Sequence, residues 1–383
     1  MTPLHEPTVD EDVTLRPTHV EVDLARIVAN LKAIRRHVGD VAVMPILKAN
    51  AYGHGLVPVA RRLQEEGVSH MGVAYLEEAI RLRRSGVSTP LLVLGGILGH
   101  QIPEYLQHDV TLTASSIDKL RAIEEAAAHR GCRARVHLKI DTGMERIGMH
   151  WYSASALIEA SLACRHVDVE GVFSHLANSD SADPSSVALQ RARFEEVLDT
   201  YRRHGAPMPL RHLANSGAVL QHPDTWYDLV RPGILLFGVA PDPSLALPEG
   251  VGPALRWVSR VVYFKVVRAG HPVSYGSTWS PPVDTRVVTV PVGYGDGYFR
   301  AMSGQAQVLI RGRRYPVVGR ICMDQVMIDI GPDGTAYNGD QVVLLGDHPD
   351  GGALEAAELA EWAGTISYEV LTNINTRVPR VYR

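Results

Sequence analysis

The sequence predicts an α/β fold: a (β/α)8 TIM-type barrel followed by a mainly β C-terminal domain. Between residues 15 and 240, short β-rich apolar runs alternate with segments of helical periodicity, which indicates βα units around a parallel sheet. A stretch rich in proline and glycine follows at 241–253, and after it come β-branched runs separated by turn residues. A length of 383 residues also suits one large and one smaller domain.

Eight apolar runs are candidate barrel strands. They are VAVMPILK (41–48), MGVA (71–74), LLVLGG (91–96), VTLTA (110–114), RVHLKID (135–141), VEGVFSH (169–175), RHLANS (211–216) and DLVRP (228–232). Helical periodicity, often ending in glycine, marks the segments between them at 56–67, 75–86, 116–131 and 186–205. This pattern favours a closed barrel, although an open α/β sheet of similar length also fits it.

Three segments follow from this pattern. We expect residues 1–14 to be a disordered tail, residues 15–250 to form the barrel, and residues 251–383 to form the mainly β domain. In the last segment only AAELAEWAG (356–364) has a helical pattern, whereas the other apolar runs are rich in β-branched residues.

Composition limits the classes of partner. A formal net charge of −4 provides no basic face for nucleic acid or an acidic membrane, so the expected partner is a small molecule. Cys132, Cys164 and Cys322 stand far apart, which argues against a disulfide framework and shows no zinc spacing, so no metal is expected. The N-terminus lacks the features of a secretory signal and no apolar run approaches ~20 residues. We therefore expect a cytoplasmic protein without a membrane partner.

Lys48 ends the first predicted strand, so on the barrel interpretation it lies at the mouth where active sites are built. A lysine that follows six apolar residues must be paired, exposed at the strand end, or covalently bound, for example as a Schiff base. The residue alone does not separate a structural role from a catalytic one.

Two further groups of polar residues follow predicted strands. HLANSG and VRPGI end the seventh and eighth strands and bring together Ser216 and a glycine backbone, which fits either a phosphate cradle or an ordinary turn and helix cap. DTGMERIG follows the fifth strand and places Lys139, Asp141 and Arg146 near the same mouth, or on a solvated turn. In the β domain, Tyr275 lies beside a glycine in VSYGSTW.

The segment GRICMDQ offers Met323 and Asp324 within an otherwise apolar run. A core tyrosine at Tyr275 and a strand-end aspartate at Asp324 are the alternative interpretations.

Eight motifs in one order resemble those of the alanine racemase family, and they span nearly the whole chain. They are ILKANAYGHG, DTGMERIG, NSG, VRPGI, SYGSTW, GYGDGY, ICMDQ and SYEVLT. Any one would be weak evidence, but so many in order over both domains are specific.

The resemblance implies pyridoxal 5'-phosphate as cofactor, bound to Lys48 as an internal aldimine. The other cofactor contacts that it implies are Tyr52, Ser216, Tyr368 and the backbone of Gly233 and Ile234 at the phosphate, His175 and Asn215 near the ring, and Arg231 at the pyridine nitrogen. Because a guanidinium keeps its proton, Arg231 would leave the ring nitrogen unprotonated and the cofactor a weaker electron sink than a carboxylate partner would.

The resemblance also implies an isomerase that interconverts L-alanine and D-alanine by a two-base mechanism and supplies D-alanine for peptidoglycan. Lys48 would serve the D-enantiomer, and Tyr275 from the partner subunit of a homodimer would serve the L-enantiomer. Arg146 matches the residue that engages the substrate carboxylate, and Lys139 matches a position that is carbamylated in many members. Met323 and Asp324 would complete the substrate site from the second subunit.

One departure from the family pattern stands beside this site, because Glu145 occupies a position where glycine or a neutral residue is usual. Two alternatives remain within the sequence. One is a racemase of broader specificity, for serine or basic amino acids, and the other is a noncatalytic pyridoxal-phosphate carrier. A lone-barrel carrier would have no use for Tyr275 or ICMDQ, both of which lie past residue 250.

Overall fold

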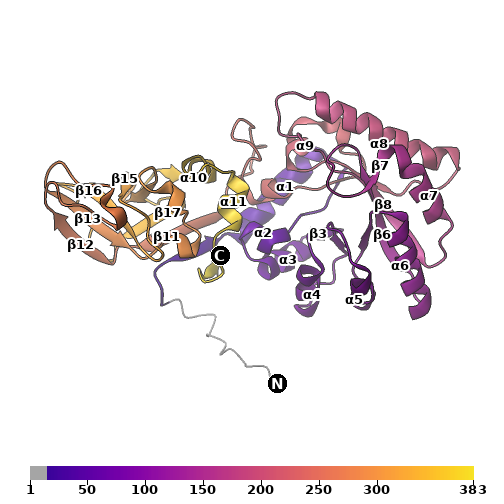
Figure 1. Cartoon of the computed structure of the whole chain (residues 1–383), viewed down its shortest axis with the longest axis horizontal. Coiled ribbons are helices and arrows are strands. Elements are labelled where there is room, and N and C mark those ends of the chain that lie inside the picture. The colour runs from indigo at the N-terminus through magenta and orange to yellow at the C-terminus, as the bar shows by residue number, and fades with distance from the viewer. Residues whose placement is uncertain (1–14) are drawn as a thin grey trace, which may run out of the picture. The chain divides into compact units, whose positions relative to one another are not determined.

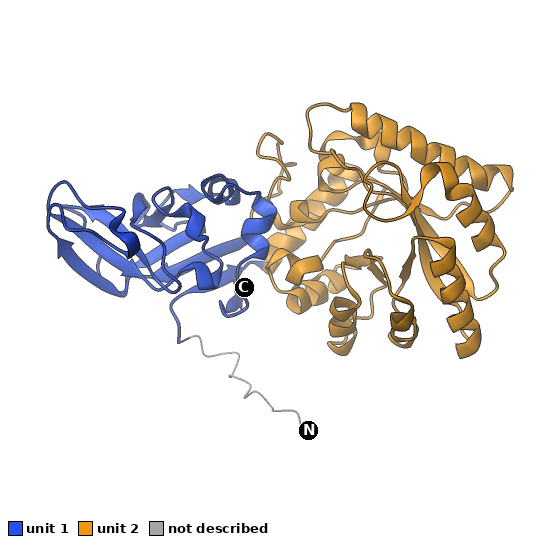
Figure 2. Cartoon of the chain, viewed as in Figure 1, with its two compact units in different colours: residues 1–23, 254–383 blue, residues 24–253 orange. Residues whose placement is uncertain are grey.

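The structure is a computed structural model that describes residues 15–383, and it divides into two compact units. The barrel unit comprises residues 24–253, and the β unit comprises residues 15–23 together with 254–383. Figure 2 shows the two units in different colours. The predicted tail at 1–14 lies outside the described residues.

All eight predicted barrel strands are present. They are β2 (Ala42–Val43), β3 (Met71–Val73), β4 (Leu91–Val93), β5 (Leu112–Ala114), β6 (Ala134–Asp141), β8 (Val167–Phe173), β9 (Leu210–His212) and β10 (Leu229–Val230). Parallel ladders join β10 to β2, β3 to β4, and β5 through β6 and β8 to β9. Parallel bridges Ile46–Gly72 and Leu92–Thr111 join these ladders. The ring closes because the Asp228 N–H donates to the Arg211 carbonyl at 3.1 Å, between β9 and β10.

The helices of the barrel unit lie outside its strands (Figure 1). They are α1 (Leu24–Val38), α2 (Lys48–Tyr52), α3 (Leu56–Glu65), α4 (Leu76–Arg84), α5 (Ile102–Gln107), α6 (Ile117–Arg130), α7 (Ala154–Leu162), α8 (Ser185–Arg203) and α9 (Ser216–Gln221). Helix α6 shows the local logic: the Ser116 hydroxyl caps its first turn by accepting from the Lys119 N–H at 3.2 Å, and Gly131 ends it at φ 70°. Four predicted helices, which correspond to α3, α4, α6 and α8, are confirmed.

Short elements complete the barrel unit. They are β7 (Met149–His150) and the 3-10 turns η1 (Gly99–Gln101), η2 (Trp151–Ser153), η3 (Pro223–Thr225) and η4 (Ile234–Phe237). Between 239 and 253 the chain has no helix or strand, as its proline and glycine content predicts.

One twisted sheet dominates the β unit, in the order β12-β13-β16-β15-β14-β17-β11-β1-β19, with β18 paired to β17. Its strands are β1 (His19–Val22), β11 (Leu255–Arg260), β12 (Tyr263–Val267), β13 (Thr285–Val290), β14 (Gln307–Ile310), β15 (Arg313–Val318), β16 (Val326–Gly331), β17 (Gln341–Asp347), β18 (Ala353–Leu354) and β19 (Arg380–Tyr382). Besides the predicted helix α10 (Ala356–Ala363), it contains α11 (Ser367–Thr372) and the 3-10 turns η5 (Tyr275–Ser277), η6 (Tyr294–Asp296) and η7 (Arg300–Met302).

The structure differs from the predicted domain boundaries at residues 15–23. Strand β1 belongs to the β unit, because it pairs antiparallel with β11 and parallel with β19. Glu21 of this strand is buried, and its carboxylate binds Arg256 at 2.9 Å and Arg383 at 2.6 Å. The second boundary lies between Pro253 and Ala254, close to the predicted 250/251.

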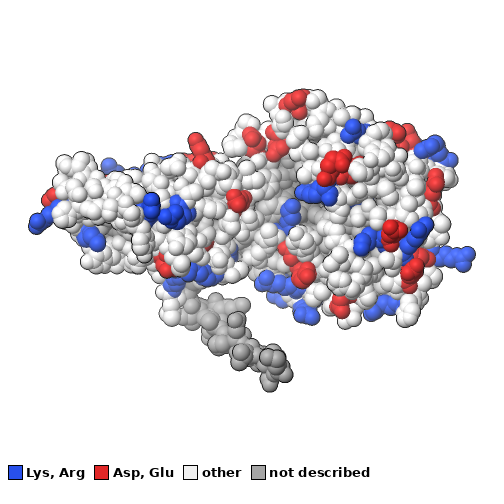
Figure 3. Space-filling model, in the orientation of Figure 1, with Lys and Arg blue, Asp and Glu red and all other residues white. Residues whose placement is uncertain are grey.

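The visible surface carries charges of both signs. Lysine and arginine as well as aspartate and glutamate are scattered over the face shown in Figure 3. Cys132, Cys164 and Cys322 are free thiols. In the part of the chain that the structure describes, no helix has the length and apolar character needed to span a membrane, and no cluster of His, Cys, Asp or Glu could hold a metal ion.

Candidate active site

The carboxyl ends of the barrel strands bring the predicted barrel residues together. Lys48 follows β2, Asp141 ends β6, His175 follows β8, Ser216 follows β9 and Arg231 follows β10. In a parallel barrel these ends share one rim, where side chains from different strands face a common space. The β-type hydrogen bonds of the first strand continue beyond β2, since the Ile46 N–H donates to the Pro232 carbonyl at 3.0 Å, so Lys48 lies at the rim as predicted.

Lys48 opens an unusual turn. Ala49, Asn50, Ala51 and Tyr52 all have φ between 51° and 56°, in the left-handed region that L-residues disfavour by roughly 1–2 kcal/mol each. Hydrogen bonds hold this turn: the Ala51 N–H donates to the Leu47 carbonyl at 2.8 Å, and the Asn50 side chain accepts from the Leu56 N–H at 2.9 Å. The turn therefore fixes the backbone on the C-terminal side of Lys48.

Positive charges surround the amine of Lys48. Desolvation by the walls of the mouth, followed by the charge of Arg146, lowers the pKa of Lys48. Lys139, which is buried inside the barrel, has a pKa well below its usual value because of burial and of the charge of Arg231. Its Nζ lies 4.5 Å from the centroid of the Phe173 ring. A site with these cations attracts an anionic ligand and favours the neutral, nucleophilic form of both lysine amines over its usual population.

Arg231 is only 3% exposed, and the groups that hold it are neutral. Its Nη1 donates to His212 Nδ1 at 2.9 Å, and its Nη2 donates to the carbonyls of Ser174 at 2.8 Å and Leu213 at 3.1 Å. His175 Nδ1 lies 3.3 Å from the same Nη2. Burial lowers the pKa of Arg231 to about 9, so that the guanidinium remains a cation at neutral pH.

The direction of these hydrogen bonds fixes the tautomers of two buried histidines. Because arginine can only donate, His212 accepts at Nδ1 and carries its proton on Nε2. That Nε2 lies 2.8 Å from His137 Nδ1, which must therefore accept, so His137 is protonated on its own Nε2. Burial lowers the pKa of His137 to about 3 and that of His212 well below its usual value, so both rings are neutral. The pair forms a directed chain of hydrogen bonds behind Arg231.

Four of the five predicted phosphate residues, Tyr52, Ser216, Gly233 and Ile234, lie near the starts of α9 and η4, whereas Tyr368 does not belong to the barrel unit. The Ser216 hydroxyl accepts from the Gly233 N–H at 2.9 Å, and a Cβ at position 233 would collide with the Tyr52 hydroxyl. Ile234, fully buried, opens η4 beside them. Asn215 has a clear structural task, since its side-chain oxygen caps α9 through the Ala218 N–H at 3.2 Å. Hydroxyl groups and closely approaching backbone N–H groups are what a phosphate binds.

The loop that carries Arg146 is organised by Asp141. The Asp141 carboxylate accepts the backbone N–H groups of Gly143, Met144, Glu145 and Arg146 at 2.9–3.2 Å, and these bonds outweigh its desolvation and lower its pKa. Glu145 has φ 53°, in the left-handed region that glycine adopts more readily than other residues. Its exposed carboxylate lies 2.9 Å from His150 Nε2.

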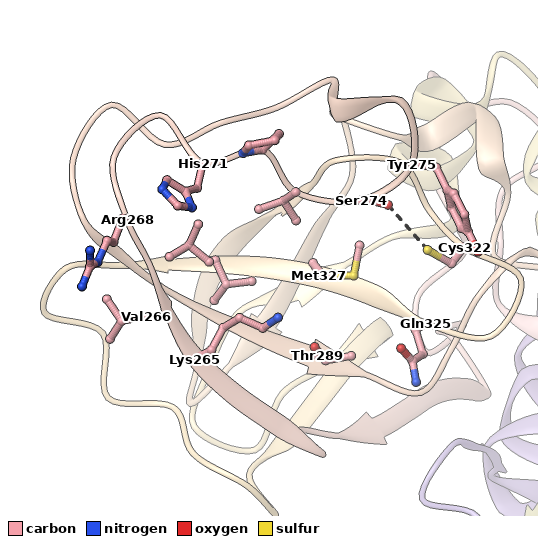
Figure 4. A pocket seen from close by; sticks show the side chains of 14 residues that line it. Lys265, Val266, Arg268, His271, Ser274, Tyr275, Thr289, Cys322, Gln325 and Met327 are labelled. Carbon is pink, nitrogen blue, oxygen red and sulfur yellow. Dashed lines mark hydrogen bonds between the residues drawn. The ribbon is translucent and has the colours of Figure 1, made fainter.

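In the β unit, Tyr275 and the ICMDQ segment lie together. The Ser274 hydroxyl, next to Tyr275, donates to the Arg320 carbonyl at 2.6 Å and lies 3.5 Å from Cys322 Sγ (Figure 4). A cavity of about 760 Å³ lies here, lined by Tyr275 and Cys322 among others. The Tyr275 side chain is 70% exposed, which excludes the core-tyrosine interpretation.

A second set of bonds holds the ICMDQ turn. The Gly295 N–H donates to the Met323 carbonyl at 2.9 Å, and Asp324 forms an ion pair with Arg377 at 2.7 Å. Met323 is 53% exposed. Tyr368 lies elsewhere in the β unit, half-buried on α11. The carboxylate of Asp324 is thus engaged in holding the turn.

Comparison with known proteins identifies the family to which this chain belongs. Residues 22–241 match the family model described as "Alanine racemase, N-terminal domain", and residues 254–382 match "Alanine racemase, C-terminal domain". An alanine racemase of Desulforamulus reducens is 43% identical over 371 residues, which cover 96% of this chain and 99% of the relative. The chain belongs to the alanine racemase family.

Solved alanine racemases share the whole fold. The enzyme from D-cycloserine producing Streptomyces lavendulae superposes with a TM-score of 0.91 at 38% identity, covering 97% of this chain and 98% of that one. A Bacillus anthracis alanine racemase with bound L-Ala-P gives 0.89 at 34% identity, covering 96% and 95%. The predicted fold class, a barrel followed by a mainly β domain, is confirmed for this member of the family.

Three residues of this alanine racemase family site escaped the sequence interpretation. His137 and His212 support Arg231, and Glu78 binds the backbone beside Lys48. A signal for His137 exists in RVHLKID, where it lies two residues before Lys139 and therefore on the same face of the strand. His212 and Glu78 act through partners far away in the sequence, so no local pattern indicates them.

Proposed function

We propose that this chain interconverts L-alanine and D-alanine with pyridoxal 5'-phosphate as cofactor, and supplies D-alanine for peptidoglycan. The observation that carries the proposal is the placement of Lys48, a lysine with a lowered pKa, on the same barrel rim as Ser216 and the buried Arg231. Membership of the family supports it. A related alanine racemase from Bartonella henselae, 28% identical with a TM-score of 0.87 over 96% of this chain and 99% of that one, carries covalently bound pyridoxal phosphate.

The residues at the rim fit this cofactor. The collision that a Cβ at Gly233 would make with the Tyr52 hydroxyl shows how closely hydroxyl and backbone approach at the proposed phosphate site, beside Ser216. Lys48 would hold the cofactor covalently, and Arg231 would present an N–H donor to the pyridine nitrogen. His175, Asn215, Ile234 and Tyr368 stay predicted contacts.

When bound, the cofactor supplies an electron-withdrawing ring that acidifies the Cα proton of the substrate. Lys48 Nζ would move that proton on one face, a task that needs the neutral amine favoured by its lowered pKa. Tyr275 Oη would serve the opposite face. Arg146 would bind the substrate carboxylate, and the Met323 backbone N–H would assist, with Asp324 holding the turn through Arg377.

Carbamylation of Lys139 remains a prediction. The modification requires a neutral amine as nucleophile, and the strongly lowered pKa of Lys139 provides one. A carbamate would also give the cationic neighbourhood of Arg146 and Arg231 a negative partner. Mass spectrometry of the intact protein, recorded with and without bicarbonate, tests this point.

A homodimer with shared active sites completes the proposal, in which Tyr275 and Met323 serve the partner subunit. Their exposure in the β unit, 70% and 53%, supports it. Mixing an inactive Lys48→Ala variant with an inactive Tyr275→Phe variant should restore activity through hybrid dimers. No recovery after verified subunit exchange would contradict the shared site. The cytoplasmic location stays a prediction.

The decisive experiment combines two variants with a chiral assay. Lys48→Ala should lose the borohydride-sensitive visible absorbance of the bound cofactor and all activity. Tyr275→Phe should slow exchange of the Cα hydrogen of L-alanine with solvent more than that of D-alanine, because Tyr275 is assigned to the L-enantiomer. Equal effects on the two exchange rates would refute the two-base assignment. Turnover of serine, lysine or arginine at rates near that of alanine would instead support the broader racemase.

A further inference from the structure

The Glu78 carboxylate joins two neighbouring segments of the barrel rim. Its Oε2 accepts the N–H groups of Ala74 at 2.8 Å and Tyr75 at 3.3 Å, which follow β3 and precede α4. Its Oε1 accepts the N–H of Ala49 at 2.7 Å, in the segment that follows β2. Ala49 is the residue directly after Lys48, so the carboxylate holds the peptide on the C-terminal side of that lysine.

Only a carboxylate of this length satisfies these donors. Both oxygens of Glu78 accept and neither donates, which matches backbone N–H groups on both sides. A glutamine would have to direct its NH2 group toward the Ala49 N–H or toward the Ala74 and Tyr75 N–H groups, and one of these contacts would become donor against donor. An aspartate, one methylene shorter, could not reach both segments.

The bond to Ala49 acts on a strained turn. Residues 49–52 keep a left-handed conformation that persists only where the surroundings determine it strongly. The bonds from Leu47 and Asn50 described above come from the same loop, whereas the Glu78 bond comes from the next βα unit. It therefore ties the direction of the Lys48 side chain to the neighbouring helix α4, at the start of the turn.

Charge supports the same conclusion. Glu78 is a negative group among the cations of the mouth, and it raises the pKa of Lys48 against the larger lowering by burial and Arg146. Its removal would leave Lys48 beside Arg146 and Arg231 without this counter-charge. Glu78 therefore influences Lys48 in two ways, through the hydrogen bond to Ala49 and through its negative charge.

We propose that Glu78 is a positioning residue for Lys48: its carboxylate holds the left-handed turn 49–52 and thereby aims the lysine amine at the cofactor carbonyl. The inference rests on the proposed role of Lys48 as the cofactor anchor. It adds a residue that does not touch substrate or cofactor but determines how readily Lys48 would bind the cofactor covalently.

Glu78→Gln tests the proposal, with Glu358→Gln as the matched control. Glu358 occupies the equivalent third position of helix α10 and accepts the Glu355 N–H at 3.0 Å, in the same capping arrangement as Glu78 with Tyr75. Both variants weaken a helix cap, but only Glu78→Gln disturbs the segment after Lys48. Glu358→Gln also weakens the ion pair of Glu358 with Arg314, so its melting temperature should fall at least as far as that of Glu78→Gln.

The informative measurement is cofactor binding. In Glu78→Gln we expect cofactor affinity, titrated by the visible absorbance of the bound form, to fall about tenfold or more, as for loss of a hydrogen bond to a charged group. Borohydride trapping on the Lys48 peptide should slow in parallel. Glu358→Gln should retain the affinity of the unaltered protein.

Hydrogen exchange provides a test that needs no variant. The Ala49 amide lies on an exposed residue, so slow exchange there in the cofactor-free protein requires the bond to Glu78. Rapid exchange at Ala49 would overturn the proposal. So would a Glu78→Gln variant that binds cofactor as tightly as Glu358→Gln does.

Failure of the proposed function gives a different result. If Lys48→Ala still formed the borohydride-sensitive species, Lys48 would not be the anchor and the proposed function would be wrong, whatever Glu78 does. If Lys48→Ala lost this species while Glu78→Gln kept full affinity, the anchor would stand and only the positioning role would be refuted.

Discussion

Acidification should destabilise the barrel unit, because three of its histidines, of which His137 and His212 are buried, are held neutral. Burial lowers the pKa of His137 to about 3, and it lowers the pKa values of His175 and His212 well below their usual value, with the charge of Arg231 adding to each shift. Arg231 contacts the rings of His175 and His212 directly, so a proton on either ring would lie beside another cation. Glu170, 4.0 Å from His137 Nε2, is the nearby carboxylate.

The sign and size follow from proton linkage. In the unfolded chain these histidines titrate near the ordinary histidine pKa of 6.5, so below that pH the unfolded state binds more protons than the folded state. The free energy of unfolding therefore falls as the pH falls below 6.5, and for His137 it continues to fall until about pH 3. At about pH 5.5, one pH unit below the ordinary pKa of histidine, keeping His137 neutral costs about 1 kcal/mol, and His175 and His212 act in the same direction. Such losses matter against the ~5–15 kcal/mol that stabilises a typical protein.

The His137→Asn variant isolates one of these protons. Its side-chain oxygen can accept from His212 Nε2 as His137 Nδ1 does, while the titrating ring is removed. The free energy of unfolding, measured by urea titrations between about pH 7.5 and about pH 5, should then fall less steeply with decreasing pH than in the unaltered protein. The difference in slope should correspond to about one proton fewer taken up on unfolding. His100→Asn, at an exposed histidine, is the control and should leave the slope unchanged.

If the free energy of unfolding had the same pH dependence in His137→Asn and in the unaltered protein, the reasoning would be refuted. They would mean that His137 takes up its proton in the folded barrel, which contradicts its burial between His212 and Gly171. A uniform offset without a change of slope would report only the lost volume of the ring.

Two further predictions concern single backbone positions. Gly171→Ala should lower the free energy of unfolding by about 1–3 kcal/mol in urea titrations, because a Cβ there would collide with His137 Nδ1 and lie 2.6 Å from its Cε1. The control is Gly99→Ala, where a Cβ meets nothing within 4 Å, and equal losses in the two variants would contradict the packing argument. Glu145→Gly should be neutral or stabilising by up to about 1 kcal/mol despite the flexibility of glycine, because φ at this position is 53°; clear destabilisation in a thermal melt would show that the contact with His150 matters more.

The barrel could be predicted from the sequence because its signals are local. Strands such as β3, β4 and β5 are buried on both faces and lie in apolar runs, and the amphipathic helices between the runs fix their order. Strand β1 was assigned to the barrel by position alone. Its four residues pair with β11 and β19, more than two hundred residues away, and no local pattern reports such a pairing.

The site was predictable to the extent that the fold places strand ends on one rim. Lys48, Ser216 and Arg231 each follow a strand, so the barrel interpretation alone brings them together. The functions of Glu78 and His212 depend instead on which backbone or side chain they meet. A glutamate at the start of a helix is an ordinary cap until the structure shows that its second oxygen reaches Ala49.

Arg231 connects the acid sensitivity of the barrel with its proposed chemistry. A carboxylate would be the simplest partner for a buried guanidinium, but it would occupy the N–H groups and offset the charge that a pyridine nitrogen would otherwise meet. The barrel instead uses carbonyl oxygens and His212. Arg231 fixes the tautomer of His212, and His212 in turn fixes the tautomer of His137. These neutral partners orient the guanidinium without neutralising it. Protonation of either ring would place a second cation in this chain of hydrogen bonds. The histidines that orient Arg231 are therefore the same residues that make the folded barrel sensitive to acid.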